Sequence, residues 1–494
     1  MQGLKPIKVS TDVEKLTLHN VMENQPLSPM ARMFHEPDSN VYIMAMIGLK
    51  TEINAEVVKA NLVHTLVKHP RFSSLQVVDE QNGGRLIWLP TEVNLDNHVV
   101  VPKLDPNSIE LSDKFVEDYI SNLSKNGIKM SIPMWDIHLL NVKTSDAESV
   151  AVLRVHHSLG DGTSLMSLFL ACTRKVSNPE EPPTIPMVNK ANSKKSSRGL
   201  WGKLIKLWLA LLLFWNTLVD VVMFLATTLM LVKDTETPLK GPLGVGTTPR
   251  RFVHRSVSLD DIMLIKNTMR TTINDVMLGV TQAGLSRYLN RKYGESIKID
   301  KGASERRNNL PKNIRLRATF FMNLRPSPGI QELADMMKKG TKAKWGNQIG
   351  YLIYPFTIAL RDNPLGYLRE AKAAMDRKKA SLEASFSYFL AKYFLKFGGM
   401  KMASFPSQTT LWFSNVAGPK EEISLFGHPV AYIAPSCFGQ PNGLMIHVVS
   451  YVNKMTFILS VDDGIIPDPH QLCDDLEESL NLIKTAIINL KTTT

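Results

Sequence analysis

The sequence predicts an α/β protein of two domains with an apolar helical segment between them. The chain has 494 residues, which is more than one compact core usually holds. Apolar residues recur with the period of strands in some stretches and with the period of helices in others. Both kinds of stretch occur before and after the apolar segment. We place the domains at residues 1–177 and 243–494, with a linker over 178–242 that carries an apolar run at about 204–232.

The first half is expected to contain a helix over residues 56–68 and strands over 85–89, 135–142 and 149–156. Trp135, Ile137 and Leu139 place apolar side chains on one face of a strand. Because residues 143–148 are polar, the last two strands are expected to pair as a hairpin that leads to a pair of histidines.

The strand 149–156 runs into the sequence His156-His157-Ser158-Leu159-Gly160-Asp161-Gly162. Asp161 and Gly162 are turn residues and 163–174 has helical spacing, so the histidines lie at a strand-to-helix turn that can face a cleft. A histidine held there can act as a general base, because its ordinary pKa lies near neutral pH. Adjacent histidines on a strand point to opposite faces, which makes a metal site the weaker interpretation.

The apolar run over 204–232 follows a linker rich in Pro, Glu, Lys and Ser. As a helix it would reach roughly 40 Å, enough to cross a bilayer. Its polar residues Asn216, Thr217, Asp220 and Thr227 fall on one narrow stripe. A single span, a short hairpin that breaks near residues 216–220 and a helix in the membrane plane all fit, and a core helix of a soluble protein is the fourth alternative.

The mixed pattern resumes after residue 242. Strands are expected over 252–257, 319–324, 409–414, 443–452 and 455–461, and helices over 272–289, 364–379, 382–397 and 468–490. Thr272 is the expected N-cap of the first of these helices, with Asn274 and Asp275 in its first turn.

The composition limits the partners. A net charge of +12 favours anionic partners, but no basic helix interleaved with aromatic residues indicates nucleic acid. Cys172, Cys437 and Cys473 are sparse and form no CxxC, which predicts reduced thiols in a protein that faces the cytosol. Residues 1–20 lack the apolar core of a signal peptide.

The sequence HHSLGDG over 156–162 resembles the HHxxxDG signature of the chloramphenicol-acetyltransferase-like, CoA-dependent acyltransferases. Four further elements resemble those of the wax ester synthases/diacylglycerol acyltransferases, in that family's order: residues 23–29, 133–136, 274–275 and 415–419. The long apolar insertion resembles the plant branch. Met134 stands where this family usually has Leu, and Ala417 where it has Pro. The DFGWG element of the related BAHD acyltransferases is absent, which favours the wax ester branch.

The resemblance implies two α/β, chloramphenicol-acetyltransferase-like domains around a central tunnel, with His157 at its midpoint. It implies that a long-chain acyl group passes from acyl-CoA to a fatty alcohol, and also to diacylglycerol, with His157 as general base. Acyl-CoA would be a co-substrate. No further cofactor and no metal is expected.

The same resemblance implies roles for the residues around His157. The expected supporting residues are His156, Asp161, Gly162, Asn274 and Asp275, and the expected substrate contacts are Trp135, Asn415 and Gly418. Asp161 is expected to turn away from the substrate and lock the turn, with Arg325 as a partner. Taken alone, Trp135 fits core packing better than substrate contact. Backbone amides and Asn274 are candidates for binding the oxyanion.

Two domains that share one tunnel must lie on the same side of a membrane. A complete span over 204–232 would separate them, so we expect a re-entrant hairpin or an in-plane helix that binds membrane lipid. The expected location is the endoplasmic reticulum membrane with the active site facing the cytosol, and the plasma membrane is the alternative. Two other functions stay open: a BAHD-like acyltransferase with a soluble acceptor, and a non-catalytic membrane lipid-binding protein.

Overall fold

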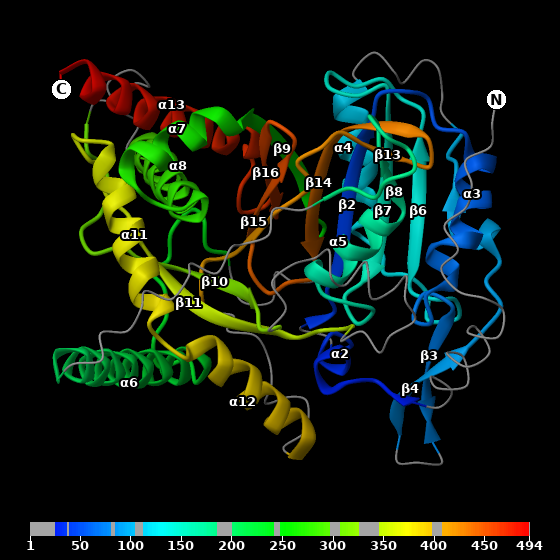
Figure 1. The fold of residues 1–494 in the computed structure, drawn as a ribbon, viewed down its shortest axis with the longest axis horizontal. Helices are drawn as coiled ribbons and strands as arrows, with labels where there is room; N and C mark the ends of the chain where they lie inside the picture. Colours follow the sequence, from blue (N-terminus) through cyan, green and yellow to red (C-terminus); the bar gives the residue numbers. More distant parts are fainter. Residues whose placement is uncertain are drawn as a thin grey trace.

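The computed structural model describes residues 25–36, 39–80, 84–103, 112–184, 200–241, 248–296, 307–325, 345–397 and 408–493. Two large sheets stand side by side, with helices packed against them, and a small sheet lies below the first (Figure 1). The strands are β1 (Gln25–Pro26), β2 (Tyr42–Leu49), β3 (Ser74–Asp79), β4 (Arg85–Pro90), β5 (Val99–Val100), β6 (Trp135–Leu140), β7 (Ser149–His156), β8 (Thr173–Lys175), β9 (Arg251–Ser258), β10 (Arg315–Asn323), β11 (Ile349–Thr357), β12 (Leu411–Val416), β13 (Ile423–Leu425), β14 (His428–Phe438), β15 (Leu444–Tyr451) and β16 (Lys454–Val461). The helices are α2 (Pro29–Met33), α3 (Ala55–His64), α4 (Ser112–Leu123), α5 (Gly162–Ala171), α6 (Leu200–Thr228), α7 (Leu259–Met269), α8 (Ile273–Ser296), α11 (Leu365–Lys379), α12 (Glu383–Phe397) and α13 (Pro469–Thr493).

The first large sheet has the strand order β5-β6-β7-β2-β14-β13-β8, and the second has the order β11-β10-β12-β15-β16-β9. Most neighbours are antiparallel, but β12 runs parallel to both β10 and β15. The small sheet has the order β1-β4-β3. The two large sheets thus give the chain its two α/β halves.

The second half of the chain contributes two strands to the first sheet. β13 and β14 follow β12 of the second sheet in the chain, yet they belong to the first sheet, where β14 pairs with β2 along its length. The chain then returns to the second sheet as β15. Because strands from beyond residue 243 complete the first sheet, the two halves form one body.

The predicted hairpins are present. β6 pairs with β7 in the register Ile137↔Leu153, and β15 pairs with β16 in the register His447↔Ile458. α8 begins after Thr272, whose hydroxyl accepts the Asp275 N–H at 3.2 Å while the Asp275 carboxylate accepts the Thr272 N–H at 2.9 Å. This reciprocal capping box satisfies two backbone donors that a helix start leaves open.

Helix α6 is unbroken from Leu200 to Thr228. The short hairpin that breaks near residues 216–220, one of the alternatives for this segment, is therefore wrong. The polar residues there bond to the protein instead of ending the helix: Asn216 Nδ2 donates to the Ala380 carbonyl at 3.1 Å, and Thr217 Oγ1 accepts the Leu382 N–H at 3.0 Å.

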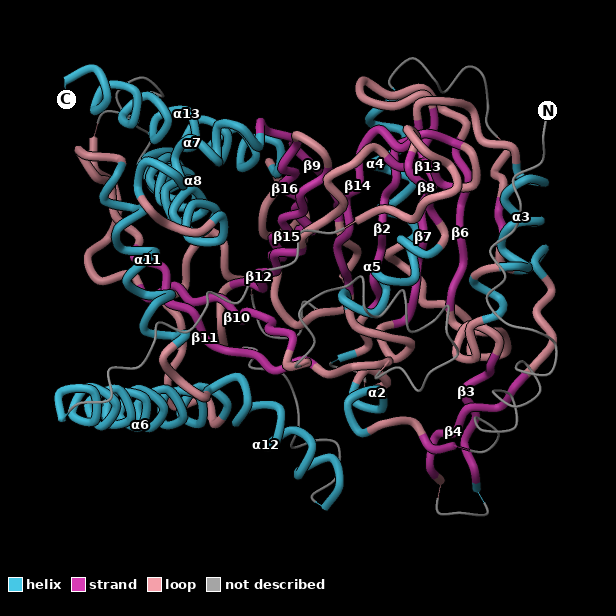
Figure 2. Tube along the Cα trace, viewed as in Figure 1, coloured by secondary structure: helices cyan, strands magenta, loops and turns pink. Residues whose placement is uncertain are grey.

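The polar stripe of α6 faces the protein and its apolar faces point outward. Asp220 is 1% exposed and accepts from Lys378 Nζ at 2.8 Å and from Arg377 Nη2 at 2.6 Å, both on α11. Trp201 is 78% and Phe214 66% exposed. The helix runs along one side of the molecule beside α12 (Figure 2). A core helix would show the reverse arrangement, so the soluble-core alternative is not supported.

Within the described residues, Trp201–Thr228 is the one helix that is long and apolar enough to cross a membrane, with a mean hydropathy of 2.1. Only 11% of its most apolar stretch is buried.

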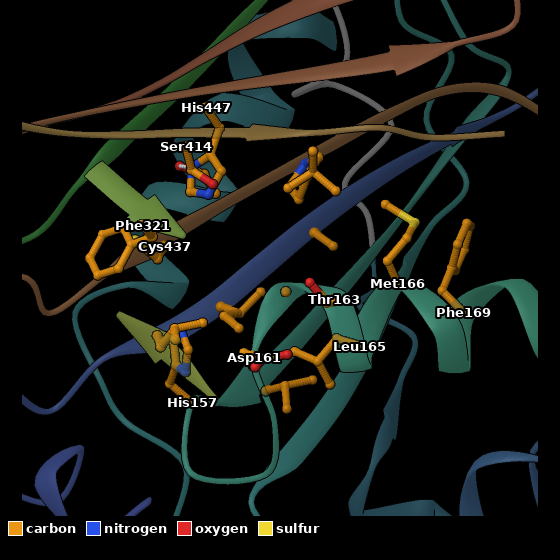
Figure 3. A pocket seen from close by; sticks show the side chains of 18 of the residues that line it. His157, Asp161, Thr163, Leu165, Met166, Phe169, Phe321, Ser414, Cys437 and His447 are labelled. Carbon is orange, nitrogen blue, oxygen red and sulfur yellow. Dashed lines mark hydrogen bonds between the residues drawn. The ribbon is translucent and has the colours of Figure 1, made fainter. Parts of the chain in front are cut away.

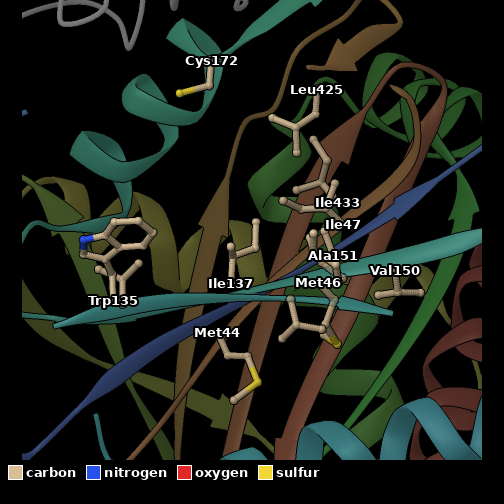
Figure 4. Packing of buried hydrophobic residues seen from close by; sticks show 14 of the residues in the cluster. Met44, Met46, Ile47, Trp135, Ile137, Val150, Ala151, Cys172, Leu425 and Ile433 are labelled. Atoms are coloured by element: carbon tan, nitrogen blue, oxygen red, sulfur yellow. The ribbon is translucent and has the colours of Figure 1, made fainter. Parts of the chain in front are cut away.

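Three clusters of buried apolar side chains hold the fold. The first fills the first sheet and includes Trp135 and Ile137 (Figure 4). The second lies between the second sheet and α8, α11 and α13. The third joins Phe224 of α6 to Met30 of α2 and Trp412 of β12. This third cluster connects the exposed helix to the region where the two sheets meet.

Candidate active site

The end of β7 delivers His157 to a cavity between the two sheets. Leu153 and Val155 line the cavity, and His157 continues the two-residue alternation of the strand onto the same face. The His157 N–H donates to the Val41 carbonyl at 3.0 Å, which holds the backbone in place just after the strand ends. His156 points to the opposite face, as expected for neighbouring residues of a strand.

The cavity is lined mostly by apolar side chains, with polar groups at His157 and Asp161 and, on another part of the wall, at Ser414 and His447 (Figure 3). Its apolar walls are formed by Phe34, Ile43, Ala45, Ile47, Leu153, Val155, Leu165, Met166, Phe169, Phe321, Ile349, Trp412, Val416, Ile433, Pro435, Cys437 and Met445. Its polar residues are His157, Asp161, Thr163, Asn323, Ser414, Asn415, Ser436 and His447. Such a lining suits a substrate with long hydrocarbon chains and one reacting polar group.

Asn347 fixes the orientation of His157. The Asn347 amide Nδ2 donates to the His157 carbonyl at 2.8 Å, and its Oδ1 lies 3.1 Å from His157 Nδ1. The amide orientation assigns the proton to Nδ1, so Nε2 carries the lone pair. Within the described residues no hydrogen bond engages Nε2. Phe34 stacks on the imidazole with ring centroids 4.1 Å apart.

Burial lowers the pKa of His157 below its ordinary value of 6.5, despite the opposing effect of the Asp161 charge. The imidazole is therefore neutral at pH 7. A neutral ring with an open Nε2 in an apolar cavity can accept a proton from a hydroxyl group.

His156 supports this arrangement through Phe34. It is fully buried, and its Nε2 donates to the Phe34 carbonyl at 3.0 Å. Its Nδ1 lies 2.6 Å from Ser158 Oγ. Burial lowers its pKa well below 6.5, so it too is neutral. His156 thus holds Phe34 at the end of β7, and the ring of Phe34 covers the imidazole of His157.

Asp161 locks the turn after the histidines. Its Oδ1 accepts the Ser164 N–H at 2.9 Å as the N-cap of α5, and its Oδ2 accepts from Arg325 Nη1 at 2.7 Å. Oδ2 also accepts the Gln348 N–H at 3.0 Å. The expected pair of Asp161 and Arg325 is present, and both side chains are almost completely buried. The pair joins the segment His156–Gly162, called the histidine loop below, to the second half of the chain.

Gly162 lines the cavity at the first position of α5. A Cβ built on it would meet no protein atom within 4 Å. A larger side chain would therefore take up cavity space and leave the fold unstrained.

Asn274 and Asn415 lie together. Asn415 lines the cavity, and its Nδ2 donates to Asn274 Oδ1 at 3.2 Å. Asn274 therefore reaches the cavity through Asn415. Asp275 is buried in the capping box with Thr272 and supports the start of α8. Its position does not reach the cavity lining.

Two expected substrate contacts are not supported by the positions of the residues. Trp135 is fully buried in the first core, and its Nε1 donates to the Phe72 carbonyl at 2.8 Å. Gly418 is absent from the cavity lining, and a Cβ on it would lie 2.0 Å from the Ser450 carbonyl oxygen. Trp135 therefore packs the core, and Gly418 permits two backbone segments to approach closely.

The structure adds residues that the sequence did not indicate. Asn347 and Phe34 contact His157, while His447, Ser414 and Ser436 supply polar atoms to the cavity wall. The Ser414–His447 strand pairing and the position of Asn347 depend on segments far apart in the chain. Phe34 carries no motif.

The chain matches two family descriptions. The wax ester synthase/diacylglycerol acyltransferase catalytic domain matches residues 30–277, and the WS/DGAT C-terminal domain matches residues 345–484. The chain is 51% identical to wax ester synthase/diacylglycerol acyltransferase 5 of Arabidopsis thaliana, over 94% of each chain. It is 49% identical to wax ester synthase/diacylglycerol acyltransferase 6 of the same plant, over 97% of this chain and 96% of that one.

Solved structures share the fold. The wax ester synthase/diacylglycerol acyltransferase from Marinobacter aquaeolei VT8 aligns with a TM-score of 0.58 at 18% identity, over 94% of this chain and all of that chain. The first condensation domain of the CDA synthetase aligns with a TM-score of 0.54 at 10% identity, over 95% and 97% of the two chains. The predicted α/β fold, with two halves and an apolar helix between them, is confirmed.

Proposed function

Because this chain belongs to the wax ester synthase/diacylglycerol acyltransferase family, and is thus an acyltransferase, we propose that it transfers a long-chain acyl group from acyl-CoA to a fatty alcohol. Diacylglycerol is the second acceptor in this proposal. The observation that carries it is the neutral His157, whose Nε2 is open to a long apolar cavity.

His157 acts as the general base. A hydroxyl group is too weak an acid to attack a thioester unaided, so Nε2 takes the hydroxyl proton as the oxygen attacks the acyl carbonyl carbon. The new C–O bond forms and the C–S bond then breaks. The imidazolium returns the proton to the departing CoA sulfur, so His157 ends neutral. Transfer is direct, with both substrates bound together.

The neighbours of His157 hold it for this step. Asn347 keeps the proton on Nδ1, and Phe34 with His156 fixes the plane of the ring. Asp161 anchors the loop through Arg325. Gly162 leaves room for substrate, and Asn415, held by Asn274, contacts it. All these are positioning roles except the contact made by Asn415.

We further propose that α6 lies in the plane of a membrane, with its apolar faces in the lipid. The helix is about 43 Å long at 1.5 Å per residue. Its outward faces are apolar, and Phe389 and Tyr393 of neighbouring α12 are also exposed. Lys203 and Lys206 at its start suit anionic headgroups. Fatty alcohols and diacylglycerol reside in the membrane, whereas acyl-CoA arrives from the cytosol.

A complete span fits the chain less well. Residues 173–175 pair with β13, and Thr235 bonds to Arg315 of β10, so both flanks of α6 attach to one body. The intervening sequence over 185–199 contains Lys190, Lys194, Lys195 and Arg198. Such a segment would have to recross the bilayer, which is costly for charged side chains. We place the protein at the cytosolic face of the endoplasmic reticulum.

The test is an assay of the full chain in detergent with labelled palmitoyl-CoA. The acceptors are hexadecanol, dioleoylglycerol and a soluble phenolic alcohol. We expect ester from hexadecanol above all. Ester from the phenolic alcohol alone would favour the BAHD-like alternative. Binding of the lipids without any ester would favour the non-catalytic alternative.

A further inference from the structure

We propose that His447 is a second catalytic residue, whose imidazole N–H donates a hydrogen bond to the carbonyl oxygen of the acyl thioester as that oxygen gains charge. The proposal rests on the proposed acyl transfer. It assigns the donor that the sequence leaves open between backbone amides and Asn274.

His447 lies on the cavity face of the second sheet. Along β15, Leu444, Ile446 and Val448 pack into the second core, whereas Met445 and His447 line the cavity. The neighbouring strand β12 shows the same alternation, and its Ser414 pairs with His447 in parallel register. His447 and Ser414 therefore form a polar pair on a wall that is mostly apolar (Figure 3).

The hydroxyl of Ser436 lies near one ring nitrogen of His447. Ser436 Oγ lies 3.4 Å from His447 Nδ1, and this contact joins β14 of the first sheet to β15 of the second. If the hydroxyl donates to Nδ1, the ring proton sits on Nε2. Within the part of the chain that the structure describes, no protein acceptor engages Nε2. A polar atom on an apolar wall without a protein partner favours a substrate atom as its partner.

His447 and His157 line the same cavity, His447 from β15 and His157 from the end of β7. His156, Tyr42 and Phe438 lie in one row across β7, β2 and β14. Adjacent strands are about 4.8 Å apart, so Phe438 is roughly 10 Å from the strand end that carries His157. Ser436, the partner of His447, lies two residues from Phe438. The charged form of His157 also lowers the pKa of His447.

The two histidines are suited to opposite tasks. His157 presents a lone pair, which takes the hydroxyl proton. Burial lowers the pKa of His447 to about 3, so its ring stays neutral and offers an N–H. A fixed neutral donor in an apolar site stabilises a developing oxyanion strongly, because the donor needs no reorganisation. No proton leaves His447 in this step.

The test compares His447→Leu with His447→Gln in the full chain, using palmitoyl-CoA and hexadecanol. We expect the leucine variant to lose about 100-fold in kcat, with KM for both substrates within about twofold, since the bond strengthens only in the transition state. The glutamine variant keeps an N–H donor and should recover at least about tenfold of that loss. His470→Leu, which removes an exposed histidine on α13, is the matched control.

Equal kcat values for the leucine variant and the wild type would overturn the proposal. So would a rise in KM for hexadecanol at unchanged kcat, which would make His447 an acceptor-binding group. If the leucine variant does not fold, Ser436→Ala takes its place. For this variant we expect kcat to fall about threefold or more at unchanged KM. An unchanged kcat would contradict the proposal. Absence of ester with the wild type would instead count against the proposed function.

Discussion

The histidine loop and helix α6 both gather polar groups where apolar ones are usual, but with different results. In the loop, buried bonds to Asn347 and Arg325 hold His157 with one ring nitrogen left open to the cavity. On α6, Asp220 and Thr227 form hydrogen bonds to other parts of the protein. Thr227 Oγ1, for example, accepts from Arg317 Nη1 at 2.7 Å. The loop thus leaves one imidazole nitrogen facing the cavity, whereas the helix presents an apolar surface outward.

The largest effect on stability is expected in the loop. Asp161→Asn removes the charge that faces Arg325, which is 2% exposed at its side chain. Removing one partner of a buried ion pair leaves the other charge uncompensated and lowers the free energy of unfolding by about 3–5 kcal/mol. Thermal unfolding should show a large fall in the melting temperature. Asp463→Asn, which breaks the exposed pair with Arg251, should cost about 0–1 kcal/mol. Equal shifts for the two variants would contradict the anchoring role of Asp161.

Asn347→Leu leaves His157 in place but removes the side chain that orients its imidazole. The variant removes the acceptor of Nδ1–H, so His157 loses its preferred tautomer. A lost orienting hydrogen bond is worth about 1–3 kcal/mol, which corresponds to about 5-fold to 100-fold in kcat. Steady-state kinetics of ester formation measure this, with the melting temperature as a check on folding. An unchanged kcat would show that Asn347 does not orient the base.

The surface of α6 can be tested without touching the site. Phe214→Ser should weaken binding to vesicles that contain anionic lipid about tenfold, since burying such a side chain is worth about 1.5–3 kcal/mol. Asn216→Ala on the polar stripe should leave vesicle binding unchanged, because Asn216 bonds to Ala380. Vesicle flotation measures both. Equal loss for the two variants would contradict the proposed orientation of the helix.

The smallest expected effect is the pH dependence. Burial lowers the pKa of His157, and a general base acts in its deprotonated form. Activity should therefore fall as the pH is lowered, with a midpoint below 6.5, where His157 becomes protonated. The logarithm of kcat/KM against pH gives this value. A midpoint at or above 6.5 would contradict a buried, neutral base.

Local patterns in the sequence were enough to predict the loop and most elements. The alternation before His157 and the turn residues Asp161 and Gly162 predict its position, and the expected partner Arg325 is present. Asn347 and His447 could not be found in this way. Asn347 contacts His157, and His447 lines the cavity, but they come from segments nearly 200 and 300 residues further along the chain, and neither belongs to a recognised motif.

Motif likeness alone also misplaced some residues. Trp135 and Gly418 belong to motifs but serve packing and a close backbone approach. The polar residues near Asn216 suggested a break in α6, because the sequence does not show that Ala380 and Leu382 would satisfy them. In each case the deciding partner comes from a distant part of the chain.

The proposed transfer of the acceptor hydroxyl proton to His157 is tested most directly by ester formation with His157→Ala. At pH 8, with saturating palmitoyl-CoA and hexadecanol, we predict a fall in kcat of about 100-fold to 10,000-fold, with the melting temperature and vesicle binding unchanged. Turnover equal to that of the wild type would contradict the account.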